Sequence, residues 1–431
     1  MTMKYLLLLI ILLKIEISFS QNLFQGSELK KANFFYEDNA NGDTVLGDYE
    51  PTGIIALDDG SVLISTEFSI NFPNEYITPI IYDTAYFRRS AIYRKKSHIS
   101  SGSVFKLNAQ FEKEWEIVFK EKRVEKILLS GENRIYVIGE EVQMKHYWIS
   151  EISSDGKILW TKTIKYKDNI AVPAAALDKK NNLYLLLEAE CKVPVRINLK
   201  NQNDRRRIVF FEEEDLNNRI AIAKYSPEGK KRWIKTLDKR RKYEKFGYNL
   251  VVSDSLVFAS STYEGFKKRG TDYDKIEGKI VSVLKKNGRR VKKFELQENE
   301  ILLYNKGLLT ITSYTKDVFK LFLNSNIRDS ISIFSARKDI RISNFIPIKN
   351  GYLILGENYN SDLDFMLIKL TKDLKFDDYW SNTNEGYQEC RGAVENSDGS
   401  IYVVGKCYKK LNDSKKSLAA YICLIKIVNS K

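Results

Sequence analysis

Pairs of apolar segments separated by tight polar turns recur along almost the whole chain. The segments are rich in Val, Ile, Leu and Tyr and run nearly continuously apolar, which is typical of strands buried on both faces of a sheet. Each turn carries Gly, Asn or Asp, residues that tolerate the positive φ of short hairpin turns. Seven such hairpins are predicted, at Gly53–Phe68, Lys126–Val142, Pro173–Glu190, Tyr248–Glu264, Glu298–Thr315, Asn344–Tyr359 and Cys390–Tyr408.

A second, more polar hairpin follows each of the first six. These copies lie at Gly102–Phe119, Tyr147–Ile164, Arg219–Leu237, Lys279–Leu296, Val318–Phe334 and Asp364–Trp380. The outer strand of each copy carries one aromatic residue, namely Trp115, Trp160, Trp233, Phe294, Phe334 or Trp380. An aromatic that recurs once per repeat on an outer strand indicates packing between neighbouring repeats rather than a ligand platform.

The strands predict a closed ring of four-stranded sheets. After the third strand of the last repeat, Ala419–Val428, the chain ends, so that repeat lacks a fourth strand. Ala32–Glu37, near the N-terminus, can supply it, with Phe34 or Phe35 as its aromatic. We therefore predict an all-β fold, a seven-bladed β-propeller of four-stranded antiparallel blades whose ring is closed by an N-terminal strand.

One stretch resembles a known type of repeat. Asp362–Gly405 has an acidic and aromatic start, an "IKL" strand, a Trp and a glycine-bounded hairpin, and it resembles the repeats of bacterial secreted seven-bladed propeller proteins. The segments around Trp160 and Trp233 are similar to the same repeat and to the quinoprotein-like propeller repeat. The resemblance implies the fold and leaves the function open, because propellers include enzymes, binding proteins and scaffolds. Quinoprotein dehydrogenases stack their cofactor on adjacent cysteines, whereas the four cysteines here are scattered, so we expect no cofactor.

The first twenty residues predict export. Lys4 is followed by the apolar run Tyr5–Leu13 and then by Ser18-Phe19-Ser20, which is typical of a cleavable signal peptide. The apolar run is too short to cross a bilayer, and no later stretch is long and apolar enough to be a transmembrane helix. We expect residues 1–20 to be removed and residues 21–431 to form a single propeller domain in the periplasm, on the cell surface or outside the cell.

The composition gives little support to catalysis. Seventy basic and 56 acidic residues give a net charge of +14, which permits polyanion binding without demonstrating it. Only two histidines, His98 and His146, are present, and they lie in different repeats, so a His-rich metal site is not expected. We find no nucleophile motif and no Gly-rich phosphate loop, and we assign no catalytic residue and no metal ligand. A carboxylate cluster around the central channel stays open as an alternative.

The cysteines of the last hairpin admit two arrangements. With a two- or four-residue turn, Cys390 and Cys407 lie directly opposite each other, and an exported protein could join them in a disulfide. With a three-residue turn and a bulge, Lys406 lies opposite Cys390 instead. We expect Cys423 to be a buried thiol and Cys191 to be unpaired.

The connections between second and third strands differ in length and emerge on one face of the ring. Long insertions are predicted at Ser69–Ser101, Cys191–Asn218 and Gly265–Gly278, and long connections in a compact domain are often functional. They interleave basic and aromatic residues, a combination that suits anionic glycans or nucleic acid, although solvated and partly self-paired insertions would look the same. The candidate ligand-binding residues are Tyr86, Arg88, Arg89, Tyr93, Arg94, Lys95, Arg205, Arg206, Arg207, Lys267, Lys268 and Arg269.

These observations favour a non-catalytic, extracytoplasmic binding or scaffolding propeller. It would engage an envelope or extracellular protein, or an anionic polysaccharide, through the inserted-loop face, as a monomer and without nucleic acid. One alternative is a carbohydrate-active hydrolase or lyase with a central carboxylate site, which predicts a deep axial pocket lined by Asp, Glu, Tyr and Arg. Another is a structural component of an envelope assembly complex.

Overall fold

The computed structural model describes seventeen segments of the chain, and in some strands it describes the backbone alone. The described residues are 30–34, 47–70, 99–141, 146–166, 170–189, 219–237, 244–269, 272–296, 300–304, 307–315, 318–323, 330–335, 340–358, 364–373, 376–381, 388–410 and 418–427. All the elements formed by these residues are β-strands. Across the described residues, no helix is long and apolar enough to cross a membrane. The predicted signal peptide, residues 1–20, lies outside the described residues.

The strands form seven four-stranded antiparallel sheets, numbered here along the chain. Sheet 1 contains β2 (Gly47–Ala56), β3 (Val62–Ile70), β4 (Ile99–Leu107) and β5 (Lys113–Phe119). Sheet 2 contains β6 (Lys122–Leu129), β7 (Ile135–Glu141), β8 (His146–Ile152) and β9 (Ile158–Thr163). Sheet 3 contains β10 (Ile170–Leu177), β11 (Leu183–Ala189), β12 (Arg219–Tyr225) and β13 (Lys231–Thr236). Sheet 4 contains β14 (Glu244–Val252), β15 (Leu256–Arg269), β16 (Asp272–Lys285) and β17 (Arg290–Leu296).

The remaining three sheets complete the chain. Sheet 5 contains β18 (Glu300–Tyr304), β19 (Gly307–Thr315), β20 (Val318–Leu323) and β21 (Ser330–Ser335). Sheet 6 contains β22 (Ile340–Ile348), β23 (Gly351–Asn358), β24 (Asp364–Thr371) and β25 (Phe376–Ser381). Sheet 7 contains β26 (Gln388–Glu395), β27 (Ile401–Lys410), β28 (Leu418–Ile427) and β1 (Lys30–Phe34).

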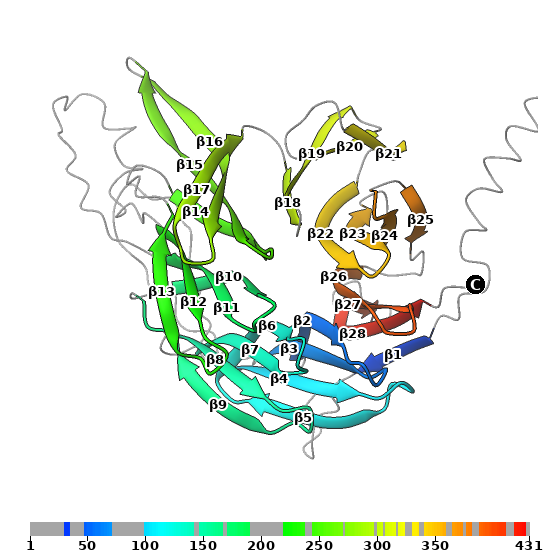
Figure 1. The fold of residues 1–431 in the computed structure, drawn as a ribbon. Coiled ribbons are helices and arrows are strands. Elements are labelled where there is room, and N and C mark those ends of the chain that lie inside the picture. Colours follow the sequence, from blue (N-terminus) through cyan, green and yellow to red (C-terminus); the bar gives the residue numbers. More distant parts are fainter. Residues whose placement is uncertain are drawn as a thin grey trace, which may run out of the picture.

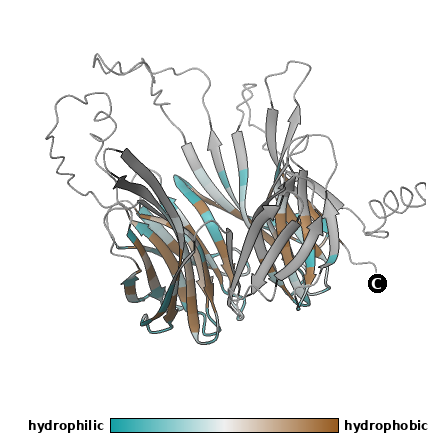
Figure 2. Ribbon diagram, turned by 90° about the horizontal axis from the view of Figure 1, so that it is seen from above, coloured by the Kyte–Doolittle hydropathy of each residue, from teal (hydrophilic) through white to brown (hydrophobic). Residues whose placement is uncertain are grey.

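The core lies between neighbouring sheets, which are arranged around a central axis (Figure 1). β7 and β11 are buried along most of their length, and their residues pack together in the interface between sheets 2 and 3. Similar clusters join sheets 1 and 2, sheets 3 and 4, sheets 6 and 7, and sheets 7 and 1. Apolar residues occupy the middle of the strands and polar ones the turns (Figure 2). The predicted all-β propeller of four-stranded antiparallel blades is therefore confirmed.

The N-terminal strand lies at the edge of sheet 7. β1 pairs antiparallel with β28, with Ala32 opposite Leu424 (Figure 1). The segment predicted for this strand, 32–37, overlaps β1 but begins two residues later, and 35–37 lie outside the described residues.

Eight hairpin turns share one geometry. In the turn of sheet 1, the Leu57 N–H donates to the Ser61 carbonyl at 2.9 Å, and the Gly60 N–H donates to the Leu57 carbonyl at 3.1 Å. The residue in the Gly60 position has a positive φ, as in a type I turn followed by a bulge. The equivalent residues elsewhere are Phe111, Asn133, Gly156, Asn181, Gly229, Gly288 and Gly399.

The outer-strand tryptophans pack against the next sheet along the chain. An added Cβ at Gly156, in the outer turn of sheet 2, would lie 2.8 Å from the Trp115 ring of sheet 1. Gly229 approaches Trp160 in the same way, at 2.6 Å, and Gly288 approaches Trp233 at 3.3 Å. The predicted packing between repeats is confirmed for these three tryptophans. The side chains of Phe294, Phe334 and Trp380 lie outside the described residues.

One predicted loop is wrong, because Gly265–Gly278 is almost entirely strand. β15 and β16 pair without interruption as far as Arg269 opposite Asp272. The register sets Lys267 opposite Asp274, and such cross-strand pairing of opposite charges favours a hairpin. The polar residues of this segment, which suggested a loop, therefore belong to a hairpin that extends from the body of the ring (Figure 1).

The opposition of Cys390 and Cys407 is also wrong. The last hairpin has the three-residue turn, and a register shift between Cys390 and Gly392 moves the pairing further than either predicted arrangement. Gly405 lies opposite the buried Cys390, and Gln388 lies opposite Cys407. Diagonal partners in a sheet are about 7–8 Å apart, beyond the usual Cα separation of a disulfide. The side chain of Cys423 and all of Cys191 lie outside the described residues.

Candidate functional site

Six of the seven innermost strands, all except β18, carry a β-bulge at equivalent positions. In β2 the pairing with β3 shifts between Pro51 and Gly53, so Thr52 is the extra residue. In β6 the extra residue is Glu125. The same shift occurs in four further inner strands, at Val172–Pro173 in β10, Tyr248 in β14, Ser343 in β22 and Arg391 in β26. A bulge bends its strand and re-aims a side chain, so the ring carries a set of redirected residues around its axis.

A cavity of about 450 Å³ opens at these bulges. Its wall includes the bulged residues of four neighbouring sheets, 7, 1, 2 and 3. The described residues that line it are Glu50, Pro51, Thr52, Glu125, Lys126, Tyr147, Ala171, Val172, Pro173 and Arg391. The volume suits a small ligand, and the wall combines a few polar groups with apolar proline, valine and alanine surfaces.

Glu125 and Tyr147 form the buried polar contact of this wall. The Tyr147 hydroxyl donates to Glu125 Oε1 at 2.7 Å, and it also takes a backbone hydrogen bond from Val172 of the next sheet. Burial raises the pKa of Glu125, against the opposing effects of Tyr147 and of the charge on Lys126. Burial and the neighbouring Glu125 also raise the pKa of Tyr147. The carboxyl group therefore keeps a proton to higher pH than an exposed glutamate does.

Lys126 adds a second ionisable group that is half-buried. Burial lowers its pKa, and the charge of Glu125 opposes that effect. Glu125 and Lys126 therefore both shift toward their neutral forms, as groups removed from water do.

Glu50 and Arg391 form an ion pair on the cavity wall. Arg391 Nη2 lies 2.6 Å from Glu50 Oε1, and Lys406 Nζ lies 3.9 Å from Glu50 Oε2. The Arg391 and Glu50 side chains are 37% and 39% exposed, so both remain within reach of a ligand. The pair joins sheet 7 to sheet 1, just as Tyr147 joins sheet 2 to sheet 3.

The cavity lies toward the end of the ring from which the second-to-third connections leave. Each inner strand ends at a hairpin turn. Four lining residues lie before the last four residues of their inner strands, and therefore away from those turns: Thr52, Glu125, Val172 and Arg391. Tyr147 is the second residue of β8, directly after such a connection. A ligand in the cavity would thus enter from the end opposite the hairpin turns.

The described residues contain no group of three or more His, Cys, Asp and Glu side chains that could hold a metal ion. His146 is an exposed residue at the start of β8, away from the cavity lining, and His98 lies outside the described residues. The cavity therefore offers hydrogen-bonding and acid–base groups.

Most of the sequence-predicted ligand-binding residues lie outside the described residues. These are Tyr86, Arg88, Arg89, Tyr93, Arg94, Lys95, Arg205, Arg206 and Arg207. Lys267, Lys268 and Arg269 lie on β15, where the structure describes only their backbone.

Sequence reasoning missed Glu125, Tyr147 and Arg391. A one-residue slip of register leaves no clear mark in a half-buried inner strand such as KRVEKILL, whose polar and apolar residues do not alternate. Pro51, Gly53, Pro173 and Gly392 were the available signal, since proline and glycine inside a strand often mark a bulge.

Comparison with known proteins adds little to this site. No model of a known protein family matches the sequence, and a search of curated proteins finds no match. Among solved structures, the chain is similar to the β-propeller domain of the trilobed protease from Pyrococcus furiosus, with 7% identity, a TM-score of 0.48 and coverage of 86% of this chain and 98% of that one. It is also similar to the α-L-arabinofuranosidase Arb93A from Fusarium graminearum, with 9% identity, a TM-score of 0.42 and coverage of 87% and 92%.

A third similar structure comprises extracellular domains 1–2 of Drosophila Semaphorin 1a, with 9% identity, a TM-score of 0.41 and coverage of 89% and 86%. All three TM-scores are below 0.5, so these likenesses carry nothing about the site or the activity.

Proposed function

We propose that this chain is an exported, non-catalytic binding propeller that holds a saccharide unit in the central cavity. The observation that supports the proposal is the gathering of bulged residues from four neighbouring sheets around one cavity of about 450 Å³. Glu125, Tyr147 and Arg391 supply the donors and acceptors that sugar hydroxyl groups require. Pro51, Val172 and Pro173 supply apolar surface for the flat face of a sugar ring.

The test is a binding measurement with a panel of neutral, amino and acidic mono- and disaccharides, read as a shift in the unfolding temperature. We expect at least one sugar to stabilise the wild type. Tyr147→Phe and Arg391→Ala should each weaken that sugar at least tenfold, because each removes a polar contact from the cavity wall. Lys120→Ala, at an exposed residue outside the cavity, is the matched control. A panel without any stabilising sugar contradicts the proposal.

A glycoside hydrolase is the second candidate, and Glu125 favours it. A buried carboxyl with a raised pKa can donate a proton to a leaving-group oxygen, and Glu50 is the second carboxylate of the cavity. In that case Glu125→Gln would abolish the release of new reducing ends while the saccharide still binds. If wild-type protein returns the bound saccharide intact after prolonged incubation, the binding role stands.

We further propose that all seven sheets are blades of one ring closed by β1, and that residues 1–20 direct export. The pairing of β1 with β28 supports the closure, and the apolar run Tyr5–Leu13 supports the export. The mature chain, 21–431, is expected to be a monomer that meets an envelope or extracellular glycan or protein. Mass spectrometry of the secreted chain should find Gln21 at its N-terminus.

A further inference from the structure

The hairpin turns of sheets 3 and 4 place ten cationic residues on the turn face, the face of the ring opposite the cavity opening. We call this set the basic sector. It consists of Lys179, Lys180, Lys224, Lys230, Lys231, Arg232, Lys285, Lys286, Arg289 and Arg290. The same turn segments, 178–182, 224–232, 253–256 and 285–290, carry only Asp178, Glu228 and Asp254 as acids, so ten minus three gives a net charge of +7.

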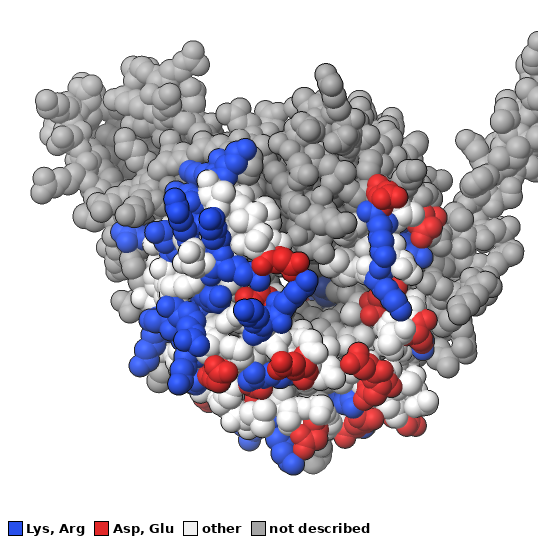
Figure 3. Space-filling model, viewed as in Figure 1, with Lys and Arg blue, Asp and Glu red and all other residues white. Residues whose placement is uncertain are grey.

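The equivalent positions of sheets 1, 2 and 7 have the opposite sign. Their eight acids are Asp58, Asp59, Glu112, Glu114, Glu132, Glu151, Asp155 and Asp398, and their five cations are Lys106, Lys113, Arg134, Lys157 and Lys426. Five minus eight gives a net charge of −3. Lys and Arg accordingly gather on the side of the ring formed by β10–β17, whereas Asp and Glu are more frequent on the side formed by β2–β5 (Figure 3). Among these turn segments, the positive charge is therefore concentrated on sheets 3 and 4.

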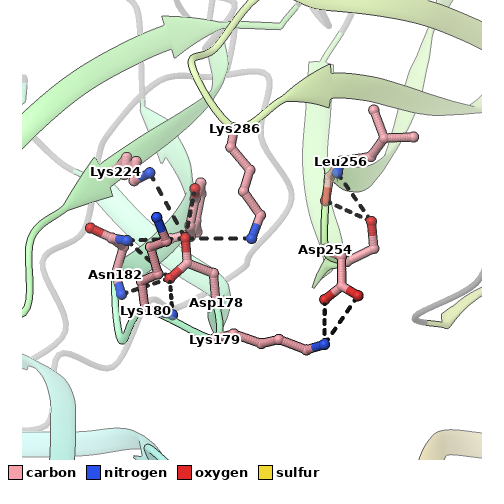
Figure 4. A network of polar contacts seen from close by, with 10 residues as sticks. Asp178, Lys179, Lys180, Asn182, Lys224, Asp254, Leu256 and Lys286 are labelled. Carbon is pink, nitrogen blue, oxygen red and sulfur yellow. Dashed lines mark hydrogen bonds and ion pairs between the residues drawn. The ribbon is translucent and has the colours of Figure 1, made fainter.

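One buried carboxylate organises the basic sector. Asp178, whose side chain is 1% exposed, lies 3.9 Å from Lys224 Nζ and 3.7 Å from Lys286 Nζ, so it draws together lysines of sheets 3 and 4 (Figure 4). The backbone N–H groups of Lys180 and Asn182 donate to it at 2.9 and 3.0 Å. Asp178 is therefore fixed in place, and the two sheets present their cations as one surface.

Little more of the positive charge is neutralised by ion pairs. Lys179 pairs with Asp254 at 2.8 Å. Seven cations form no ion pair with any residue that the structure describes, namely Lys180, Lys230, Lys231, Arg232, Lys285, Arg289 and Arg290. Burial lowers the pKa of Lys224, and the charges of Lys286, Arg232 and Lys180 lower it further. The cations therefore repel one another at close range, and a polyanion that settles among them relieves that repulsion.

The chemistry of the surface favours a polysaccharide over a nucleic acid. Single-stranded nucleic acids gain affinity when their bases stack on exposed aromatic rings. The exposed large apolar residues of the described chain are Val118, Ile158, Leu159 and Val291, none of which is aromatic. Tyr225, within these turn segments, is buried, and Trp233, which directly follows them, is packed against Gly288 and Tyr184. A sulfated or carboxylated polysaccharide needs only the guanidinium and ammonium groups.

We propose that the basic sector binds an anionic polysaccharide through its sulfate or carboxylate groups. The site is distinct from the central cavity, because the cavity opens at the other end of the ring. Binding at the basic sector does not depend on the saccharide in the cavity. A negative result at one site therefore leaves the proposal for the other site standing.

The test compares two triple charge reversals of the full mature chain. Lys180→Glu, Lys230→Glu and Lys285→Glu together alter the basic sector, whereas Lys113→Glu, Lys120→Glu and Lys157→Glu make the same change of net charge on sheets 1 and 2. Affinity is measured for dextran sulfate, polygalacturonate, neutral dextran, a single-stranded oligonucleotide and a DNA duplex over a range of salt concentrations. Circular dichroism and the urea midpoint verify that both variants fold.

We expect dextran sulfate or polygalacturonate to bind the wild type and neutral dextran not to bind. The basic-sector variant should bind at least tenfold more weakly, with a shallower salt dependence, and the control variant should stay within twofold of the wild type. Equal losses in the two variants would show that net charge alone acts, and would overturn the proposal. Absence of binding, or tighter binding of either nucleic acid, would overturn it as well. The cavity variants Tyr147→Phe and Arg391→Ala should bind dextran sulfate as the wild type does.

Discussion

At the scale of single residues, the contacts between sheets depend on glycines that face tryptophans. Gly229 has a φ of +70°, and a Cβ there would lie 2.6 Å from the Trp160 ring. Trp160 is held in turn by a hydrogen bond from its Nε1 to Glu151 Oε2 at 2.6 Å. The ring therefore has little freedom to give way, and only glycine fits both the backbone and the gap.

Gly229→Ala should destabilise the protein by about 2–3 kcal/mol, because a left-handed conformation and an overpacked contact each add to the cost. Gly131→Ala is the matched control, since a Cβ at Gly131 meets nothing within 4 Å. The control should change the free energy of unfolding by less than about 0.5 kcal/mol. Urea denaturation measures both, and equal effects would disprove the role of the tryptophan contact.

A recurring ion pair links the first hairpin turn to the third strand. Asp59 contacts Lys106 at 2.9 Å, and Asp398 contacts Lys426 at 3.5 Å. In sheet 2 the charges are exchanged: Arg134 of the turn contacts Glu151 of the third strand at 2.7 Å. The same position thus accepts either polarity, which indicates that the pairing matters more than the identity of each partner.

The pair at Asp59 predicts a pH dependence. Partial burial opposes ionisation of Asp59, but hydrogen bonds from Ser61 and Lys106 outweigh it and lower its pKa to about 2. Because the folded-state pKa is depressed below the unfolded value of 3.8, the contribution to stability is full above about pH 4 and is lost as the pH falls toward 2. The Asp59 side chain is 57% exposed, so water limits the effect to less than about 1 kcal/mol.

Asp59→Asn should therefore be less stable than the wild type at pH 7, and the difference should disappear near pH 2. Urea midpoints of both proteins between pH 2 and pH 7 measure it. A difference that stays constant over this range would show that the ionised pair does not contribute.

At the scale of elements, the sequence predicted hairpins well and registers poorly. Apolar runs and turn residues located all seven first hairpins, because strand burial and positive φ leave direct traces in composition. The bulges at Glu125 and Arg391 were not predicted, since KRVEKILL and QECRGAVE show no regular alternation of polar and apolar residues that a slip of one residue would break. The cavity followed from those bulges and was missed with them.

The N-terminal strand predicts a difference between two truncations. A chain that lacks residues 21–34 loses β1 and exposes the edge of β28, whereas a chain that lacks residues 21–29 keeps β1. We expect the first to unfold at lower urea and to be cleaved faster by protease, and the second to resemble the full mature chain. Identical urea midpoints for the two truncations would contradict closure by β1.

At the scale of the whole molecule, the two ends of the ring differ in chemistry. One end holds a cavity of polar and apolar groups at the bulges of the inner strands, and the other end holds hairpin turns divided into basic and acidic sides (Figure 3). The cavity and the hairpin turns lie at opposite ends because every inner strand runs from the cavity end to a hairpin turn. A saccharide in the cavity and a polyanion on the turn face would therefore occupy opposite ends of the ring.

Crystallography can test whether the bulges of the inner strands form the functional site. Crystals of the mature chain would be soaked with the sugar that most stabilises it. We expect electron density for that sugar in the cavity, within hydrogen-bonding distance of Tyr147 or Glu125 on one side and of Arg391 on the other. Density for the sugar elsewhere on the ring, with the cavity holding only water, would contradict it.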